Sequence, residues 1–286
     1  MKNFEGFFVK ICDSNHSFAV IFGRNKCKEE KSSFIQVITR DSVYKKIFDY
    51  KDYKTTRKPF SVSIGKNKAD TNGMVLNLPN IVASFRFDAF APIKYDAMGF
   101  FRFFPFMECK HKVISMNHNA SGKLTINEQE FSFEAGRSYI EGDQGCSFPK
   151  KYFWTQCNLF AENPSLSIMA SCARIPYLGL RFVGTICIIQ HEGHEYRLAT
   201  YRMARIKLFT ADKLTVKQGN KLLVIEVLDT NKHTHELLAP IGGKMDRTIK
   251  ETVNTTVRYK LLSGSKTIFD VTSDHAAYEY SNTNLS

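Results

Sequence analysis

Short apolar stretches separated by polar turns fill the first half of the chain. β-branched and aromatic residues recur in these stretches without the three-to-four-residue spacing of a helix, which is the pattern of strands. We expect strands at Phe7–Ile11, Ser17–Phe22, Ser33–Thr39, Phe60–Ile64 and Met74–Leu78. Turn-forming residues separate them, as at Asp13–Asn15 and Lys66–Gly73,.

The second half of the chain repeats this pattern. Strands are expected at Arg137–Asp143, Tyr152–Phe160, Leu166–Ala173, Phe182–His191, His194–Met203, Lys221–Asp229, Thr256–Leu262 and Thr267–Ser273. Many short strands at regular spacing are typical of a sandwich or a barrel. The sequence therefore predicts an all-β fold.

One segment breaks the pattern. Between Asp41 and Tyr53, the apolar residues Val43, Tyr44, Ile47 and Phe48 would share one face of a helix,. We expect a helix there.

A faint internal repeat indicates two similar halves. The aromatic stretch Phe4–Ile11 is followed by a polar turn and by Ser17–Phe22, and Phe148–Gln156 is followed in the same way by Leu166–Ala173. The two copies lie about half a chain apart, as expected for two related domains. We therefore expect domains at residues 1–135 and 136–286. Because no Pro/Ser-rich linker separates the halves, we expect them to pack closely.

Composition and charge narrow the class of protein. Apolar residues make up 43% and aromatic residues 13% of the 286 positions, so the chain can form a sizeable core,. The net charge of +12 is spread along the chain. No Arg-rich arm, helix-turn-helix or RNA-binding aromatic signature accompanies it, so we expect no nucleic-acid partner. A solvated basic surface is the plain interpretation, and contact with anionic lipid headgroups is the alternative.

The expected cellular location rests on two sequence patterns, those of a signal peptide and of a membrane-spanning segment. The first residues carry Glu5 and Lys10 within their apolar stretch, which is not the pattern of a signal peptide,. The longest apolar run, Ile175–Ile189, is too short to span a bilayer,. We expect a cytoplasmic protein, with the inner face of the membrane as a candidate site of peripheral contact. The seven cysteines form no Cys-x-x-Cys pair and are expected to be reduced,.

Three motifs resemble those of the tocopherol cyclase-like family. They are Met98–Asn127, Gly136–Phe160 with Glu141 and Asp143 at its centre, and Leu238–Glu251. The opening Phe4–Lys10 and the closing Tyr278–Tyr280 fit as well, so the resemblance covers nearly the whole chain. The chain departs from the family's motifs at two places that are expected to shape the substrate pocket. Gln144 stands where relatives usually carry Trp, and Phe7 and Phe8 replace a Trp-Tyr pair.

The resemblance implies a fold and a chemistry. The family is associated with a pair of lipocalin-like antiparallel β-barrels and includes enzymes that close a chromanol ring from a prenylated quinol. More distantly, Tyr139–Gly145 is similar to a motif of carotenoid 1,2-hydratases. Both reactions begin by protonating an isolated alkene, which requires a carboxylic acid held in an apolar pocket.

The acidic residues of the second motif suit this task. If Arg137–Asp143 is extended, then Arg137, Tyr139, Glu141 and Asp143 share one face,. Burial and the neighbouring Asp143 would then favour the protonated form of Glu141. Glu141 is the expected general acid, supported by Asp143, with Tyr139 beside the substrate. The alternative is a structural ion pair between Arg137 and either acid.

A second alternating stretch offers a binding surface. Tyr152, Trp154, Gln156 and Asn158 share one strand face, and Phe153, Thr155 and Cys157 share the other,. Aromatic rings beside two amides suit a flat, mostly apolar ligand with a few hydroxyl or carbonyl groups. In the alternative interpretation the Trp packs in the core while the amides satisfy backbone groups.

The histidines give no metal site. His111 would share a strand face with Cys109 and Ser115, opposite Glu108. Without an evident partner charge, we interpret it as a structural histidine, with substrate contact as the alternative. The cluster His191–Glu195 lacks the spacing of a zinc motif and is predicted to form a hairpin tip,. No metal and no cofactor are expected.

Two functions remain open. The first is a cofactor-independent cyclase or hydratase that protonates an alkene in a prenylated quinol or similar hydrophobic substrate. The second is a non-catalytic, lipocalin-like carrier of a hydrophobic small molecule.

Overall fold

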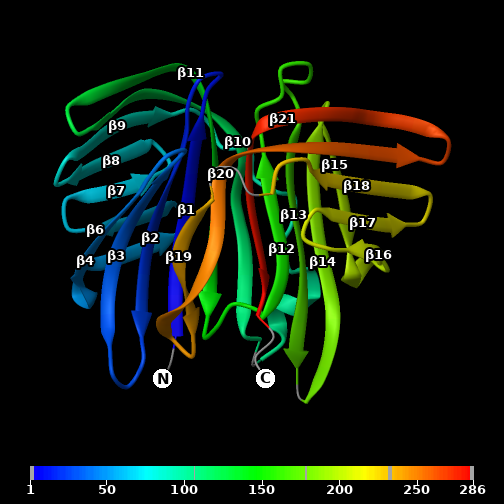
Figure 1. The fold of residues 1–286 in the computed structure, drawn as a ribbon, viewed down its shortest axis with the longest axis horizontal. Coiled ribbons are helices and arrows are strands. Elements are labelled where there is room, and N and C mark those ends of the chain that lie inside the picture. The colour runs from blue at the N-terminus through cyan, green and yellow to red at the C-terminus, as the bar shows by residue number, and fades with distance from the viewer. Residues whose placement is uncertain (1–2, 106, 178, 231–233, 284–286) are drawn as a thin grey trace. The chain divides into compact units, whose positions relative to one another are not determined.

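The computed structural model describes residues 3–105, 107–177, 179–230 and 234–283, and most of them lie in two antiparallel sheets (Figure 1). The all-β, lipocalin-like fold expected from the sequence is confirmed. The helical segments of this described part are the 3-10 turns Tyr50–Asp52 (η1), Gly99–Phe103 (η2) and Thr200–Arg202 (η3). None of them has the length or hydropathy to span a bilayer.

Two compact units divide the chain. Unit 1 comprises residues 1–93, 111–147 and 240–246, and unit 2 comprises residues 94–110, 148–239 and 247–286. Each unit is thus assembled from three separate segments of sequence.

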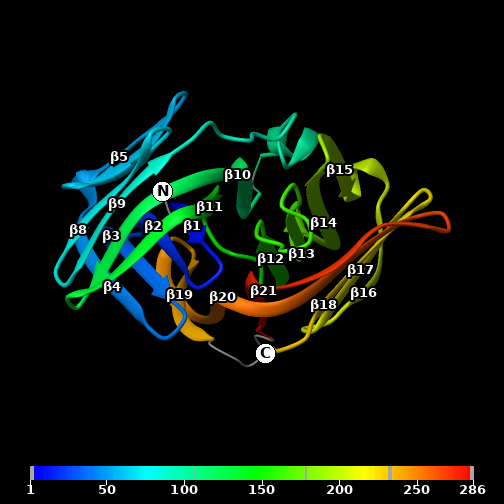
Figure 2. The same ribbon diagram turned by 90° about the horizontal axis from the view of Figure 1, so that it is seen from above.

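Unit 1 contains an eleven-stranded sheet with the order β4-β3-β2-β1-β11-β10-β9-β8-β7-β6-β5. Figure 2 shows the curvature of this sheet. Its strands are β1 (Asn3–Cys12), β2 (Ser17–Lys26), β3 (Lys31–Thr39), β4 (Val43–Asp49), β5 (Tyr53–Arg57), β6 (Phe60–Ile64), β7 (Asn67–Asp70), β8 (Gly73–Leu78), β9 (Ile81–Phe87), β10 (Cys109–Ile126) and β11 (Gln129–Gly145).

Unit 2 contains most of a ten-stranded sheet with the order β15-β14-β13-β12-β21-β20-β18-β17-β16, and β19 pairs with β20. Its strands are β12 (Lys151–Cys157), β13 (Ser167–Tyr177), β14 (Leu180–His191), β15 (His194–Ala199), β16 (Arg205–Phe209), β17 (Lys213–Gln218), β18 (Lys221–Val227), β19 (His235–Ile241), β20 (Lys244–Ser263) and β21 (Lys266–Asn282). The tip between β19 and β20 belongs to unit 1.

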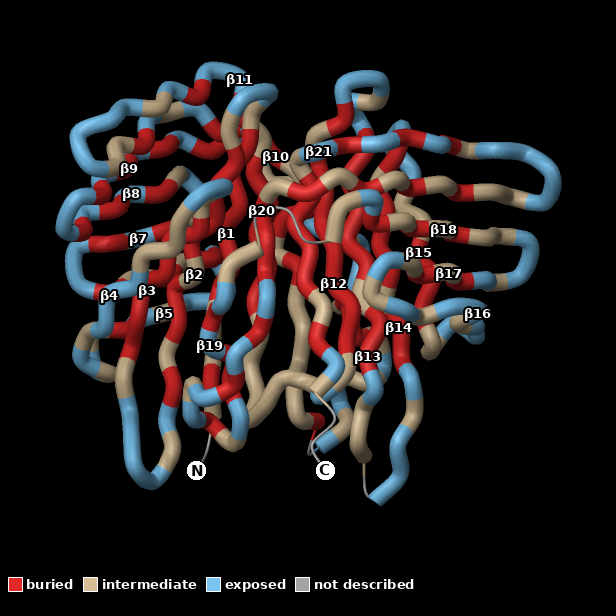
Figure 3. Tube along the Cα trace, viewed as in Figure 1, coloured by how far each residue is buried: buried red, intermediate tan, exposed pale blue. Residues whose placement is uncertain are grey.

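Alternation of apolar and polar residues buries one face of the outer strands, whereas β1, β2 and β12 are buried on both faces. In β9, every second residue from Ile81 to Phe87 is buried and the residues between are exposed, which is the period of a strand. The buried residues of unit 1 form one core that includes Phe22, Phe85 and Phe133, and unit 2 has a core of its own around Phe153 and Tyr259. Figure 3 shows the buried positions along the strands and the exposed ones at hairpin ends.

The first strand of unit 1 pairs with its last strand. β1 and β11 run antiparallel from Phe4 opposite Gly145 to Cys12 opposite Arg137. The boundary expected between residues 135 and 136 therefore lies within β11, and the unit's second segment ends at residue 147. The expected boundary thus divides the strand that completes the sheet of unit 1.

The two sheets share a connectivity, in agreement with the internal repeat. In each sheet the opening hairpin, β1–β2 or β12–β13, begins a run of four sequential strands. The opening strand then pairs with the last strand of its own sheet, β11 or β21.

The predicted helix at residues 41–53 is wrong. This segment forms β4, η1 and β5, with β4 paired along β3 from Val43 opposite Ile38 to Asp49 opposite Ser32. Tyr44 and Phe48 pack against the core of unit 1, whereas Ile47 is 64% exposed. Spacing of four residues returns to the same face in both a helix and a strand, so Tyr44 and Phe48 fit either structure.

A buried histidine generates a prediction on pH-dependent stability. Burial lowers the pKa of His118 to about 3, and its ring lies against Phe87 and Phe90. The folded protein therefore keeps His118 neutral, whereas the unfolded chain protonates it below about pH 6.5. The contribution of neutral His118 to the free energy of unfolding is fully present above about pH 6.5. It is lost as the pH falls toward 3, by at most about 1.4 kcal/mol per pH unit,.

His118→Gln removes this proton-binding group. We expect the free energy of unfolding, measured by urea denaturation, to fall less steeply between pH 6.5 and 4 in this variant than in the unmodified protein. His194→Gln, at an exposed hairpin end, is the control. Equal slopes for His118→Gln and the unmodified protein would contradict the assignment.

Candidate functional site

The central residues of the second motif alternate as an extended strand requires. Ile140 of β11 belongs to the core of unit 1. Tyr139 and Glu141 lie on the other face, where the Tyr139 hydroxyl donates a hydrogen bond to Glu141 Oε2 at 2.5 Å. The predicted shared face of Tyr139 and Glu141 is therefore present in the structure.

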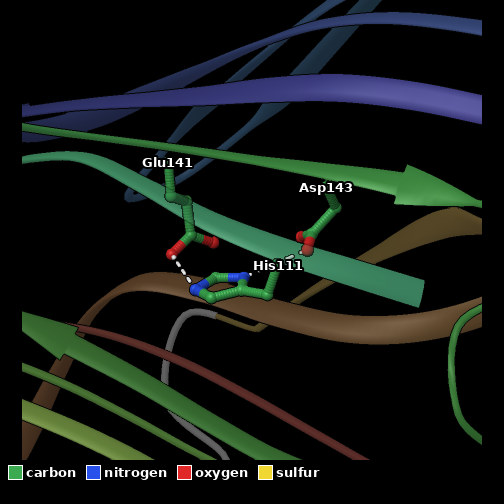
Figure 4. Close-up of side chains that lie close together, drawn as sticks. All are labelled: His111, Glu141 and Asp143. Carbon is green, nitrogen blue, oxygen red and sulfur yellow. Dashed lines mark hydrogen bonds and ion pairs between the residues drawn. The ribbon is translucent and has the colours of Figure 1, made fainter. Parts of the chain in front are cut away.

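His111 of β10 lies between the two carboxylates of β11 (Figure 4). Its Nδ1 is 3.0 Å from Asp143 Oδ1, and its Nε2 is 3.4 Å from Glu141 Oε2. A carboxylate accepts hydrogen bonds, so the contact with Asp143 places a proton on Nδ1. Nε2 is then the nitrogen that can exchange a proton with Glu141.

Burial is graded along this set of three side chains. The side chain of Glu141 is 7% exposed, that of His111 is 13% exposed and that of Asp143 is 23% exposed. Of the three side chains, Glu141 is thus the most shielded from water and Asp143 is the most exposed to it. A proton entering from solvent can reach Glu141 through the imidazole.

The expectation that His111 lacks a partner charge is wrong. Both of its partners come from the neighbouring strand, 30 or more residues further along the chain.

Tyr139 supports Glu141 as a hydrogen-bond donor. Burial, and then the negative charge of Glu141, hold the pKa of Tyr139 well above its ordinary value. The phenol therefore keeps its proton at neutral pH. Lys10, which lies opposite Tyr139 in the β1–β11 pairing, is fully buried and was missed by the sequence analysis.

Arg137 does not form the alternative ion pair. Its Nη1 donates to Asn119 Oδ1 at 2.8 Å, so neither Glu141 nor Asp143 depends on it for neutralisation. Gln144, where relatives usually carry Trp, accepts hydrogen bonds at Oε1 from Arg57 and Lys112, each at 3.0 Å.

The predicted aromatic and amide residues belong to unit 2. Phe153 and Cys157 are part of its core, while Tyr152, Trp154, Gln156 and Asn158 are buried on the alternate positions of the same stretch. The Tyr152 hydroxyl donates to Glu279 Oε1. Glu279 lies opposite both Trp154 and Glu251 in the sheet, and both glutamates are buried. The sequence analysis missed this acidic pair, since neither residue stands out in its local pattern.

The geometry of His111, Glu141 and Asp143 suits proton transfer better than metal binding. One ligand atom from each can be chosen so that all three lie within 4.8 Å of one another. The carboxylates, however, contact opposite nitrogens of the imidazole (Figure 4). One ion can bind only one of these nitrogens, so this arrangement does not direct the three ligands at a common point.

The other histidine cluster is a hairpin end, as expected. His191 lies opposite His194 in the β14–β15 pairing, with Glu192 and Gly193 at positive φ in the turn. His191 Nε2 is 2.8 Å from Asn163 Nδ2.

A family model and two curated relatives match this chain. The family model for tocopherol cyclase-like proteins matches residues 79–281. The chloroplastic tocopherol cyclase of Zea mays is 26% identical over 199 residues, which cover 63% of this chain and 41% of that protein. The chain thus spans about two fifths of the length of the curated relatives it matches.

Two solved structures share the fold. Kievitone hydratase from Nectria haematococca has a TM-score of 0.57 at 13% identity, covering 99% of this chain and 89% of that one. CghA in complex with Sch210972 has a TM-score of 0.64 at 9% identity, covering 100% and 90%. Likeness at these identities concerns the fold alone.

The site geometry predicts independence from metal. We expect elemental analysis of the purified protein to find no zinc, iron or manganese in stoichiometric amounts. Dialysis against a chelator should leave the thermal unfolding midpoint unchanged. A bound ion that is lost in His111→Gln but kept in His191→Gln would contradict this prediction.

Proposed function

The chain belongs to the tocopherol cyclase-like family, and on this premise we propose that it is an enzyme that protonates an alkene in a hydrophobic, prenylated substrate. An internal hydroxyl then closes a ring, or water adds. The observation that supports this proposal is the position of His111 between a buried Glu141 and a more exposed Asp143.

Glu141 is the proposed general acid. Tyr139 and His111 both meet its Oε2, so both act on the carboxyl group that is proposed to deliver its proton to the alkene. His111 restores that proton, and Asp143 orients the imidazole and stabilises its protonated form. Asp143 is therefore a positioning residue for His111 rather than a second acid.

The proposed reaction conserves atoms and electrons. The alkene π electrons form a C–H bond with the proton of Glu141, which leaves a carbocation on the more substituted carbon. The phenolic oxygen attacks this carbon, the C–O bond closes the ring, and the phenolic proton passes to His111 Nε2, which returns it to the Glu141 carboxylate. Attack by water instead gives a hydrated product. No oxidation or reduction occurs, so the chemistry requires no redox cofactor.

A hydrophobic substrate suits this chemistry. A carbocation is short-lived in water, so a buried acid protects the intermediate from unwanted capture. A prenylated quinol supplies both the alkene and the internal nucleophile, and it is therefore the first substrate class to test.

Replacing the proposed acid tests the assignment directly. Glu141→Gln keeps the size of the side chain but removes its acidic proton. We expect kcat on a prenylated quinol to fall by about 10²–10⁴, while the dissociation constant of the quinol changes little. Rates come from product formation and affinities from calorimetry.

Glu5→Gln is the matched control for this experiment. Glu5 is a partly buried carboxylate of the same sheet that pairs with Arg24, and its loss should leave kcat unchanged. Full activity of Glu141→Gln across the pH range would exclude Glu141 as the acid. Tight quinol binding without turnover by the unmodified protein would favour a non-catalytic carrier.

Asp143→Asn tests the relay through His111. The neutral amide stabilises the imidazolium less than the carboxylate does, so kcat should fall less than in Glu141→Gln and the pH optimum should move to lower pH. KM should stay within about twofold, because the substrate contacts are retained. An unchanged pH profile would show that Asp143 has no part in proton transfer.

A further inference from the structure

Arg247 of β20 is a buried arginine without a carboxylate partner among the described residues. It is 6% exposed, and its Nε and Nη2 make no hydrogen bond in the structure. Buried charges are ordinarily paired, because an unpaired one loses its hydration without compensation. The two unused N–H groups of Arg247 therefore favour a site for an anionic ligand.

The guanidinium is held in place by its other nitrogen. Nη1 donates to the main-chain carbonyls of Phe148 at 3.4 Å and Pro149 at 3.0 Å. Its central carbon lies 5.8 Å from the centre of the Tyr152 ring. These contacts fix the orientation of the planar group and leave the edge formed by Nε and Nη2 unused.

Arg258 on the same strand shows what this edge binds. Its Nε donates to Asp270 Oδ1 at 2.7 Å, and its Nη2 donates to Asp270 Oδ2 at 2.8 Å. The two parallel N–H groups match the two oxygens of a carboxylate. Arg247 presents the same edge without such a partner.

Neighbouring side chains do not complete the pair. Glu108 is the acidic residue whose charge acts on Arg247, but no ion pair joins them in the described part of unit 2. The Tyr152 hydroxyl is already donated to Glu279, and the ring of Phe148 packs edge-on against Tyr152 at 6.1 Å. Tyr152 thus lies near the guanidinium, and Phe148 packs against Tyr152.

We propose that Arg247 is the anchor of a binding site in unit 2 for the carboxylate group of an aromatic or otherwise hydrophobic acid. The guanidinium supplies one positive charge, which a carboxylate neutralises in full. A phosphate dianion would leave one negative charge buried, so it fits less well. Tyr152 and Phe148 provide apolar surface for the body of the acid. The residues of this site belong to unit 2, whereas those of the proposed proton relay belong to unit 1.

The test uses the purified full chain and a panel of matched probes. Benzoate, phenylacetate and decanoate are compared with their neutral amides and with inorganic phosphate by calorimetry. We expect at least one acid to bind about tenfold or more tightly than its amide. Phosphate should bind more weakly than that acid.

Three variants locate the binding. Arg247→Gln and Arg247→Lys should each weaken acid binding about tenfold or more, because lysine keeps the charge but lacks the two-pronged geometry. Arg258→Gln is the matched control and should bind the acid normally, since its edge is already occupied by Asp270. Circular dichroism and thermal unfolding verify that each variant is folded.

Several results would overturn the proposal: equal binding of acids and amides, unchanged acid binding in folded Arg247→Gln, a preference for phosphate, or no binding of any acid at millimolar concentration. Glu141→Gln should leave acid binding intact. Failure of the alkene-protonation proposal and failure of this one are therefore distinguishable.

Discussion

Each sheet places its first strand beside its last, and in unit 1 this long-range pairing determines which face of β11 carries Tyr139 and Glu141. In unit 1, β11 adds to β1 from Gly145 opposite Phe4 to Arg137 opposite Cys12. A shift of one residue in this register would exchange the two faces of the strand. With the observed register Ile140 enters the core, and Tyr139 and Glu141 lie on the opposite face, where Asp143 and Glu141 contact His111.

The candidate site consequently rests on paired strands rather than on loops. β10 supplies His111 and β11 supplies both carboxylates, so their separations are set by the spacing of adjacent strands. Side chains carried by a sheet are held more precisely than those carried by loops. Burial of Glu141 and hydrogen bonding by Tyr139 then determine the environment of one carboxyl group.

Local patterns predicted the strands and their faces well, because alternation is a property of neighbouring residues. The shared face of Tyr139 and Glu141 could be predicted because every second residue of a strand points to the same side. The contact of His111 with Asp143 could not be obtained in this way, because it depends on the register between β10 and β11. Counting outward from the turn at Asn127 and Glu128, sixteen residues in each direction, places position 111 opposite position 144 (127 − 16 and 128 + 16). A count that is wrong by one residue places a side chain on the opposite face of its strand. Counting from the turn therefore places His111 close to Asp143 along the strands, but it does not predict that the two side chains are in contact. Residues 94–110 belong to unit 2 and residues 240–246 to unit 1, and no local sequence pattern predicts either assignment.

The three-segment construction of each unit has a consequence for the order in which the protein can form during its synthesis. β1 ends at residue 12 and its partner β11 begins at residue 129, so the first strand leaves the ribosome long before the strand that joins it. The last segment of unit 1, residues 240–246, follows most of unit 2. Contacts between such distant parts of a chain form slowly. While they are awaited, the apolar strands of the nascent chain have unpaired edges, so this architecture places its greatest demand on protection from aggregation before the chain is finished.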